Sequence, residues 1–188
     1  MPDTPITGAL LLAAGRSERF GPQNKLLAPV AGEPMVRHAL RLLRAPGIAA
    51  PLVVASAPEI AAEAARLGLE ALMLPPGGPQ SESLRAGLGQ LRARGIGRLL
   101  VLLADMPFLT DADVARVLAA PPGQAASAEL DGAPLPPALF PAALFARLEA
   151  LSGDRGAGAV LRALPGRIAV PVPPAHLRDI DLRSDLDG

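Results

Sequence analysis

The first candidate for chemistry is a glycine-containing, basic loop that follows an apolar segment near the start of the chain. Residues 9–12 are all apolar, and Gly15 follows two alanines. The next ten residues contain three cations and one hydroxyl, namely Arg16, Arg19, Lys25 and Ser17. This pattern is typical of a buried strand that runs into a turn whose backbone N–H groups bind an anion. Nearby cations could neutralise the phosphates of a triphosphate and the charge on its leaving group.

Lys25 is the only lysine of the chain, and the other residues counted as basic are all arginine. A single lysine in such a background indicates a site that needs a compact ammonium rather than a planar guanidinium. The alternative for Lys25 is a surface residue without a role. For Arg16 and Arg19 the alternative is solvated surface charge.

The loop matches neither of the common phosphate-binding patterns. Gly15 and Gly21 are six positions apart, so the G-x-G-x-x-G pattern is absent, and no G-K-[ST] sequence follows. We therefore do not expect a dehydrogenase or an ordinary P-loop kinase.

A second candidate is Asp105, which follows the most apolar predicted strand, residues 98–103. A carboxylate at the end of a buried strand is costly unless it is paired or binds a cation. If this strand lies beside the first strand, Asp105 and the Gly15 loop face one crevice. A carboxylate beside a phosphate-binding loop commonly holds Mg²⁺, which takes its other ligands from water and the nucleotide. The alternative is an aspartate that caps a helix or lies in a loop.

The composition argues against several other classes of function. The chain has 188 residues, a formal net charge of zero, 2% aromatic residues and no cysteine. These values argue against nucleic-acid binding, disulfides and a cysteine zinc site. No apolar run approaches the ~18 residues that a membrane span needs, and the first residues lack the basic region of a signal peptide. We expect a soluble, cytoplasmic protein.

The hydrophobic pattern of the first two thirds of the chain predicts an α/β fold. Strands are expected at residues 6–12, 52–55, 69–74 and 98–103, with a short extended piece at 26–30. Helices are expected to start near Pro34, at Pro58, at Ser81 or Ser83, and after Thr110 as a cap. Strands that alternate with helices of this length indicate βαβ units around a parallel sheet.

After Pro121 the alternation ends. Residues 135–140 are expected to form a short edge strand or a loop, because prolines cannot donate to a sheet ladder. Helices are expected at 142–151 and 156–164, and a last strand at 168–172. We expect a single domain.

Five segments resemble, in order, the motifs of the nucleotidyltransferases related to molybdenum cofactor cytidylyltransferase, a group that includes molybdenum cofactor guanylyltransferase. The segments are residues 12–21 followed by Lys25, then 80–88, 103–107, 153–157 and 179–181. The resemblance covers nearly the whole chain. It implies a three-layer, Rossmann-like, mostly parallel sheet of the nucleotide-diphosphate-sugar transferase type. It also implies that residues 1–120 bind nucleotide and metal, whereas 121–188 bind the acceptor and complete the metal site.

The resemblance further implies a reaction in which a substrate phosphate attacks the α-phosphorus of a nucleoside triphosphate and releases pyrophosphate. The implied nucleotide-binding residues are Leu12, Ala13, Ala14, Gly15, Arg16, Ser17, Lys25, Ser81, Ser83 and Gly87. Arg19, Lys25 and Asp105 are the implied catalytic residues. Asp105, together with Asp179 or Asp181, is implied to hold Mg²⁺. Because the nucleophile arrives ionised, no histidine base is needed, and we expect packing or surface roles for His38 and His176.

The nucleobase of the triphosphate and the acceptor substrate are predicted from finer features. The Ala13-Ala14-Gly15 form resembles the cytidylyltransferases, and a methyl group at Ala14 leaves less room beside the strand end, which favours a pyrimidine. We expect CTP and molybdopterin carrying molybdenum as substrates, a monomer, and delivery of the product to a molybdoenzyme maturation partner. The alternatives are guanylyl transfer, transfer to a sugar or other small phosphate, and a maturation factor that binds the cofactor without turnover. Gly158, where this group often has arginine, and the tail after Asp181 depart from the pattern.

Overall fold

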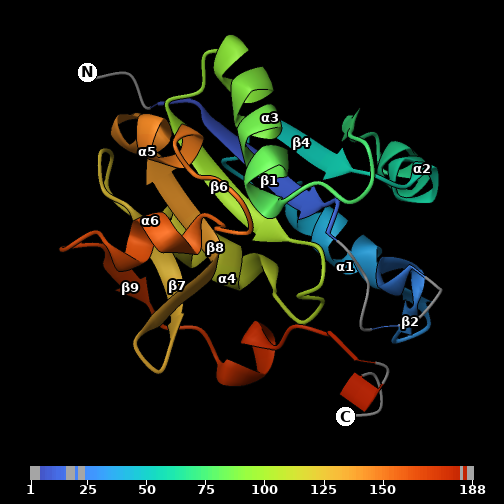
Figure 1. The fold of residues 1–188 in the computed structure, drawn as a ribbon. Coiled ribbons are helices and arrows are strands. Elements are labelled where there is room, and N and C mark those ends of the chain that lie inside the picture. The colour runs from blue at the N-terminus through green and yellow to red at the C-terminus, as the bar shows by residue number, and fades with distance from the viewer. Residues whose placement is uncertain (1–4, 16–19, 21–23, 183, 186–188) are drawn as a thin grey trace.

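The computed structural model describes residues 5–15, 20, 24–182 and 184–185. Within them, seven strands form one sheet in the order β5-β4-β1-β6-β8-β7-β9. The strands are β1 (Thr7–Ala13), β4 (Ala50–Ala55), β5 (Ala71–Met73), β6 (Arg98–Leu103), β7 (Ala126–Leu130), β8 (Ala133–Pro141) and β9 (Ile168–Val170). Neighbouring strands are parallel except in the two pairs that contain β8. The expected α/β fold with a mostly parallel sheet is confirmed (Figure 1).

Helices connect the strands and cover the sheet. The α-helices of the described residues are α1 (Met35–Leu42), α2 (Pro58–Arg66), α3 (Gln80–Ala93), α4 (Asp111–Leu118), α5 (Phe145–Glu149) and α6 (Gly158–Arg162). Shorter elements are the 3₁₀ turns η1 (Lys25–Leu27), η2 (Ala142–Leu144) and η3 (Pro174–Leu177), and a ribbon of β2 (Pro29–Val30) with β3 (Glu33–Pro34). None of the helices in the described residues is long and apolar enough to cross a membrane.

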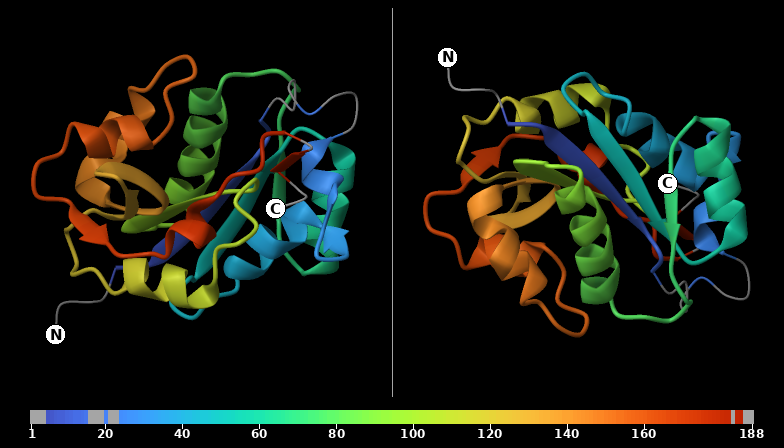
Figure 2. Two further views of the ribbon diagram at one scale, coloured as in Figure 1. Left: turned by 90° about the horizontal axis from the view of Figure 1, so that it is seen from below. Right: turned by 90° about the horizontal axis from the view of Figure 1, so that it is seen from above.

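The molecule has three layers because apolar side chains point to both faces of the sheet. Leu11 of β1 belongs to a hydrophobic cluster formed with α1, α2 and α4. Its neighbour Leu10 belongs to a second cluster, formed with α3, α5 and α6. All seven residues of β1 are buried, as a central strand of a parallel sheet requires. The two helical layers are seen on opposite sides of the sheet in Figure 2.

The prediction for residues 135–140 was wrong, because β8 is an inner strand between β6 and β7. Two of its prolines, Pro136 and Pro137, are tolerated because they lie outside the regular part of both ladders. On the β6 side, pairing covers only the four residues from Ala138 to Pro141. On the β7 side, the register shifts between Ser127 and Ala128, opposite Pro136 and Pro137. A missing N–H at such an irregularity leaves no ladder hydrogen bond unmade.

Two local predictions near the candidate site also need correction. The piece expected to be extended at 26–30 begins instead with η1, and the extended backbone starts only at Ala28, before β2. The α3 helix is not capped by a serine, since Pro79 is its N-cap and Ser81 and Ser83 lie in its first turn. By contrast, Thr110 caps α4 as predicted, in a capping box with Asp113.

The C-terminal elements are shorter than predicted. The segment 142–151 divides into η2 and α5, α6 covers five residues of 156–164, and β9 ends at Val170. Residues 171–182 then run from β9 toward the carboxyl ends of β1 and β6, with η3 as their only regular element in the described part of the chain. This tail brings acidic side chains to the sheet edge.

Candidate active site

The carboxyl ends of β1 and β6 lie side by side, which is the condition under which Asp105 and the Gly15 loop were expected to face one crevice. Leu12 pairs with Leu103, so Gly15 and Asp105 both follow the same edge of the sheet. Between them is a cavity of about 310 Å³, called here the β1–β6 cavity. It is lined by Leu12, Ala14, Gly15, Gly78, Gln80, Ser83, Leu103, Asp105 and Asp154. Ligands of open α/β sheets bind at such an edge, outside the carboxyl ends of the strands.

Lys25 lies at this edge and joins two carboxylates that are far apart in the sequence. Its Nζ donates to Oδ2 of Asp105 at 2.9 Å and to Oδ1 of Asp181 at 2.8 Å. The residue is only 8% exposed. Burial by itself would lower the pKa of the Lys25 ammonium, but the charges and hydrogen bonds of Asp105 and Asp181 outweigh it and raise that pKa. Lys25 is therefore a charged ammonium at neutral pH.

A short turn places Lys25. The side chain of Asn24, the N-cap of η1, accepts a hydrogen bond from the backbone N–H of Leu26 at 3.1 Å. Leu26 is buried and anchors the other side of the turn. The only asparagine of the chain therefore stabilises the turn that carries its only lysine.

Asp181 reaches the site because the tail pairs with the turn after β6. The backbone N–H of Ile180 donates to the backbone carbonyl of Asp105 at 3.0 Å, and the Ile180 side chain is fully buried. Asp185 then accepts from the backbone N–H groups of Asp181 at 2.9 Å and Leu182 at 2.7 Å. These two hydrogen bonds lower the pKa of the Asp185 carboxyl. Asp185 was missed as a site residue, because its role depends on the backbone groups that the folded tail presents to it.

A second contact fixes the tail farther from the cavity. Nδ1 of His176 lies 2.9 Å from Oδ2 of the fully buried Asp113 in α4. Arg116, also in α4, donates to the backbone carbonyl of Pro171 at 2.6 Å. Burial tends to raise the pKa of the Asp113 carboxyl, but hydrogen bonds from Thr110 and His176 outweigh it and lower the pKa. His176 is thus more than the packing or surface residue that was expected, since it ties the tail to α4.

The two carboxylates at Lys25 fit Mg²⁺ only with help from a ligand. In the described part of the chain, no group of three or more acidic or histidine side chains could hold a metal ion alone. Mg²⁺ commonly takes one or two carboxylates and completes its shell with water and substrate phosphates, so Asp105 and Asp181 are a suitable pair. Asp179 is exposed, and no hydrogen bond or ion pair joins it to another described residue. Of the two tail aspartates, Asp181 is therefore the better placed.

The other predicted site residues divide into three groups. Leu12, Ala14, Gly15 and Ser83 line the β1–β6 cavity. Ala13, Ser81 and Gly87 are buried and are not among its lining residues. Arg16, Ser17 and Arg19 lie outside the described residues.

Gly87 has a packing role in the structure. A Cβ atom there would lie 2.3 Å from Cδ1 of Leu10, so the absence of a side chain lets α3 approach β1 closely. Four lining residues were missed as site residues, namely Gly78, Gln80, Leu103 and Asp154. Gln80, Leu103 and Asp154 lie inside segments that resemble the family motifs, and this resemblance could have indicated them as site residues.

The fold and the edge site together define a nucleotidyltransferase domain. A parallel sheet presents a glycine turn after β1 and an aspartate after its neighbour β6, with a charged lysine between two carboxylates. Residues 9–168 match the model of the MobA-like NTP transferase domain, and the chain belongs to this family.

Known proteins agree with this assignment. The chain is similar to the molybdenum cofactor guanylyltransferase of Rhodobacter capsulatus, with 33% identity over 86% of this chain and 82% of that protein. It is 27% identical to the purine catabolism protein PucB of Bacillus subtilis, over 98% of this chain and 96% of that one. It is 37% identical to the bifunctional protein GlmU of Rhizobium leguminosarum over 55% of this chain, but spans only 24% of that protein's length. A nucleotidyl transferase from Methanothermobacter has the same fold, with a TM-score of 0.81, 23% identity and coverage of 96% of this chain and 94% of that one.

Proposed function

We propose that the chain transfers CMP from CTP to the phosphate of molybdopterin carrying molybdenum, with Mg²⁺ as cofactor and release of pyrophosphate. The observation that carries the proposal is the Lys25 ammonium between Asp105 and Asp181 beside the β1–β6 cavity. A cation and two carboxylates at one strand edge supply the charges that a metal–triphosphate needs.

In this reaction an oxygen of the acceptor phosphate forms a bond to the α-phosphorus of CTP. The bond from that phosphorus to the oxygen bridging to the β-phosphorus breaks, and pyrophosphate leaves with the electron pair. The acceptor phosphate is already ionised, so no protein group has to remove a proton. The protein contributes mainly position and charge, as is usual for such transfers.

The residues have separate roles in the proposal. Asp105 and Asp181 hold Mg²⁺, which when bound neutralises the phosphates and polarises the reacting phosphoryl group. Lys25, whose neighbouring carboxylates keep its pKa above the ordinary value, binds phosphate oxygens of CTP as an ammonium. Gly15 and Ser83, which line the cavity, approach the triphosphate from the β1 loop and the first turn of α3.

The choice of CTP rests on Ala14. This residue is buried and lines the β1–β6 cavity, so its methyl group takes up space beside the end of β1. A smaller pyrimidine fits better next to it than a purine does. Guanylyl transfer is the second candidate, favoured by the similarity to a protein named molybdenum cofactor guanylyltransferase.

The test is a pyrophosphate-release assay with CTP, GTP, ATP and UTP, each with and without molybdenum-loaded molybdopterin and with Mg²⁺. We expect pyrophosphate release to be largest with CTP and to depend on the acceptor. Release should be lost in Asp105→Asn. It should persist in the control Asp111→Asn, which replaces an exposed carboxylate on α4. Best activity with GTP would support the second candidate. Nucleotide binding without any release would favour a carrier that does not turn over.

A further inference from the structure

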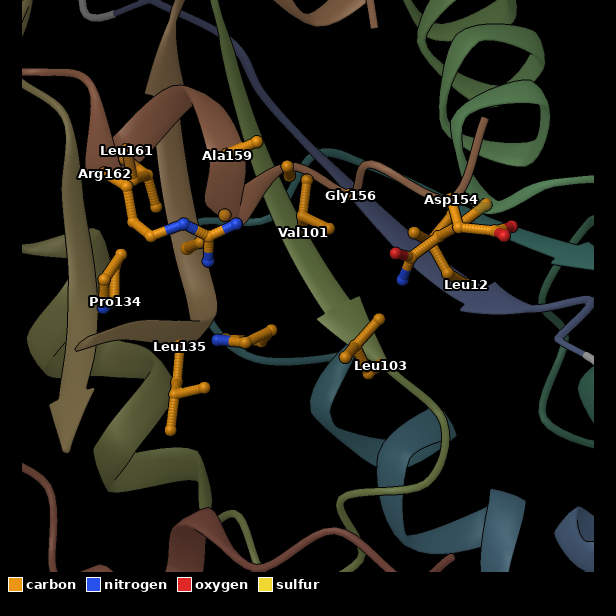
Figure 3. A pocket seen from close by; sticks show the side chains of 15 residues that line it. Leu12, Val101, Leu103, Pro134, Leu135, Asp154, Gly156, Ala159, Leu161 and Arg162 are labelled. Carbon is orange, nitrogen blue, oxygen red and sulfur yellow. The ribbon is translucent and has the colours of Figure 1, made fainter. Parts of the chain in front are cut away.

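A second cavity adjoins the first and has a different character. This β8–α6 cavity has a volume of about 260 Å³ and lies between β6, β8 and α6 (Figure 3). Most of its lining is apolar, including Val101, Leu135 and Leu161. Its polar lining side chains in the described part of the chain are those of Gln80, Asp154 and Arg162. Such a cavity suits a ligand with an apolar body and few polar groups.

The two cavities share part of their walls. Leu12, Gln80, Leu103 and Asp154 line both of them. A molecule in the β8–α6 cavity therefore lies next to a nucleotide in the β1–β6 cavity. Under the proposed function, the phosphate that attacks the nucleotide must be at this shared border, next to the β1–β6 cavity that Asp105 lines.

Arg162 is not at this border. Figure 3 shows it beside Pro134 and Leu161, on the opposite side of the cavity from Leu12 and Asp154. Within the described residues, no hydrogen bond or ion pair engages the Arg162 guanidinium. It is also the only cationic side chain among the described residues that line this cavity. A guanidinium in this position is suited to bind two oxygens of an anionic group.

Gly158 lies next to this guanidinium. A Cβ atom at Gly158 would lie 3.4 Å from Nη1 of Arg162 and 3.8 Å from the backbone carbonyl oxygen of Pro134. A branched side chain there would occupy the space that Nη1 now uses. Gly158 and Arg162 are four residues apart in α6 and therefore on one face of the helix.

We propose that the β8–α6 cavity binds the acceptor, and that Arg162 selects acceptors with a second anionic group besides the phosphate that reacts. The reacting phosphate is at the shared border, so Arg162, at the far end, holds a different group. The apolar wall between the two ends contacts the body of the acceptor. This inference rests on the proposed function, and it goes further by naming the class of acceptor: an organic phosphate that is anionic at both ends.

The first experiment compares two small phosphates that differ in one group. Calorimetric titration gives the dissociation constants of 3-phosphoglycerate and glycerol 3-phosphate. Their ratio measures how much a second anionic group adds to binding, because only 3-phosphoglycerate has a carboxylate. We expect the wild-type protein to bind 3-phosphoglycerate at least about tenfold more tightly, the range of a charge-assisted bidentate contact. Arg162→Met and Gly158→Val should both abolish this preference, whereas Arg162→Lys should retain part of it. The control is Arg147→Met, which replaces an exposed arginine of α5 and should leave the preference unchanged. Equal binding by the wild type, absence of binding, or a preference that survives Arg162→Met would overturn the inference.

The second experiment separates this inference from the proposed function. The dissociation constants of a non-hydrolysable CTP analogue with Mg²⁺, and of molybdenum-loaded molybdopterin, are measured for the same variants under anaerobic conditions. We expect Arg162→Met to weaken acceptor binding about tenfold or more and to leave CTP-analogue binding unchanged. If the wild type does not bind the CTP analogue, the proposed function fails, whereas the 3-phosphoglycerate comparison still decides the role of Arg162.

Discussion

The Nζ of Lys25 lies 2.9 Å from Oδ2 of Asp105, although the two residues are 80 positions apart in the sequence. The same ammonium is shared with Asp181, which is 156 positions away. A lysine from the β1 loop region, an aspartate from the turn after β6 and an aspartate from the C-terminal tail thus form one charged group.

Replacement of Lys25 by methionine should abolish most of the turnover. The variant keeps the length of the side chain but removes the charge that faces the phosphates, and loss of one such electrostatic contact typically costs about 10²-fold or more in kcat. Stability should change less, by about 1 kcal/mol, because both carboxylates are partly exposed and can be solvated. Pyrophosphate release and urea unfolding measure the two effects. Turnover that is unchanged in Lys25→Met would exclude a role for this lysine in the reaction.

Metal binding should depend on the nucleotide. In the structure Lys25 forms ion pairs with both proposed ligands of Mg²⁺, so a metal ion alone has to compete with its ammonium. A triphosphate offers Lys25 other anionic oxygens, and the metal should then bind better. We expect Mn²⁺, followed by its electron paramagnetic resonance signal, to bind about tenfold more tightly with CTP present than without it. In Lys25→Met the metal should bind well without nucleotide, and a nucleotide effect of equal size in both proteins would contradict this competition.

The contact between Asp113 and His176 should stabilise the fold in a pH-dependent way. The folded-state pKa of Asp113 is lowered, so its carboxylate stabilises the protein above its ordinary pKa of 3.8, and this contribution is lost as the pH falls through the lowered value. Asp113→Ala should therefore reduce the free energy of unfolding by about 2 kcal/mol at pH 7, through loss of the cap and the buried hydrogen bonds. Urea unfolding at pH 7 and pH 3 should show a smaller difference between the two proteins at the lower pH.

Replacement of His176 by alanine tests the tail contact without disturbing the cap of α4. It leaves the capping box of Thr110 and Asp113 intact but removes the hydrogen bond from the tail. We expect turnover to fall several-fold, because Asp181 is held less firmly, while the helix content measured by circular dichroism stays the same. A loss of helix content equal to that of Asp113→Ala would show that His176 acts on α4 and not on the tail.

Gly87 and Gly89 form a matched pair in α3. Gly87→Ala should destabilise the protein by about 1–3 kcal/mol, because the new methyl group would overlap with Leu10. Gly89→Ala should be neutral or stabilising by up to about 1 kcal/mol, since nothing lies within 4 Å of its Cβ position and alanine favours the helix. Chemical denaturation measures both effects. Equal effects of the two substitutions would show that close packing of α3 on β1 is unimportant.

Much of the structure of residues 1–120 could be predicted because its signals are local. The apolar runs of β1 and β6 are long enough to indicate buried strands, and the alternation of strands and helices indicates a parallel sheet. The cap at Thr110 is also local, since its partner Asp113 is three residues away. Asp105 could be singled out because it follows a buried strand directly.

The second half was harder to predict because its structure depends on distant partners. Pro136 and Pro137 of β8 argue against an inner strand when read alone, and they are tolerated because β6 and β7 pair with other residues of β8. The roles of Asp185 and His176 depend on where the tail runs, and Arg162 faces a cavity formed by three separate elements. Residue spacing carries no information on such contacts.

The amino-acid sequence is therefore sufficient to indicate the α/β class, the alternation of the first strands and helices along the chain, and the two strand ends at which chemistry is expected, those followed by Gly15 and Asp105. These depend on hydrophobic periodicity and on residue types next to strand ends, both of which are properties of short segments. The three-dimensional fold was needed to show that Lys25 joins Asp105 to Asp181, and that Asp181 is better placed than Asp179. The physical reason is that a 2.8 Å ion pair across 156 residues exists only after the sheet, the η1 turn and the docked tail have formed together.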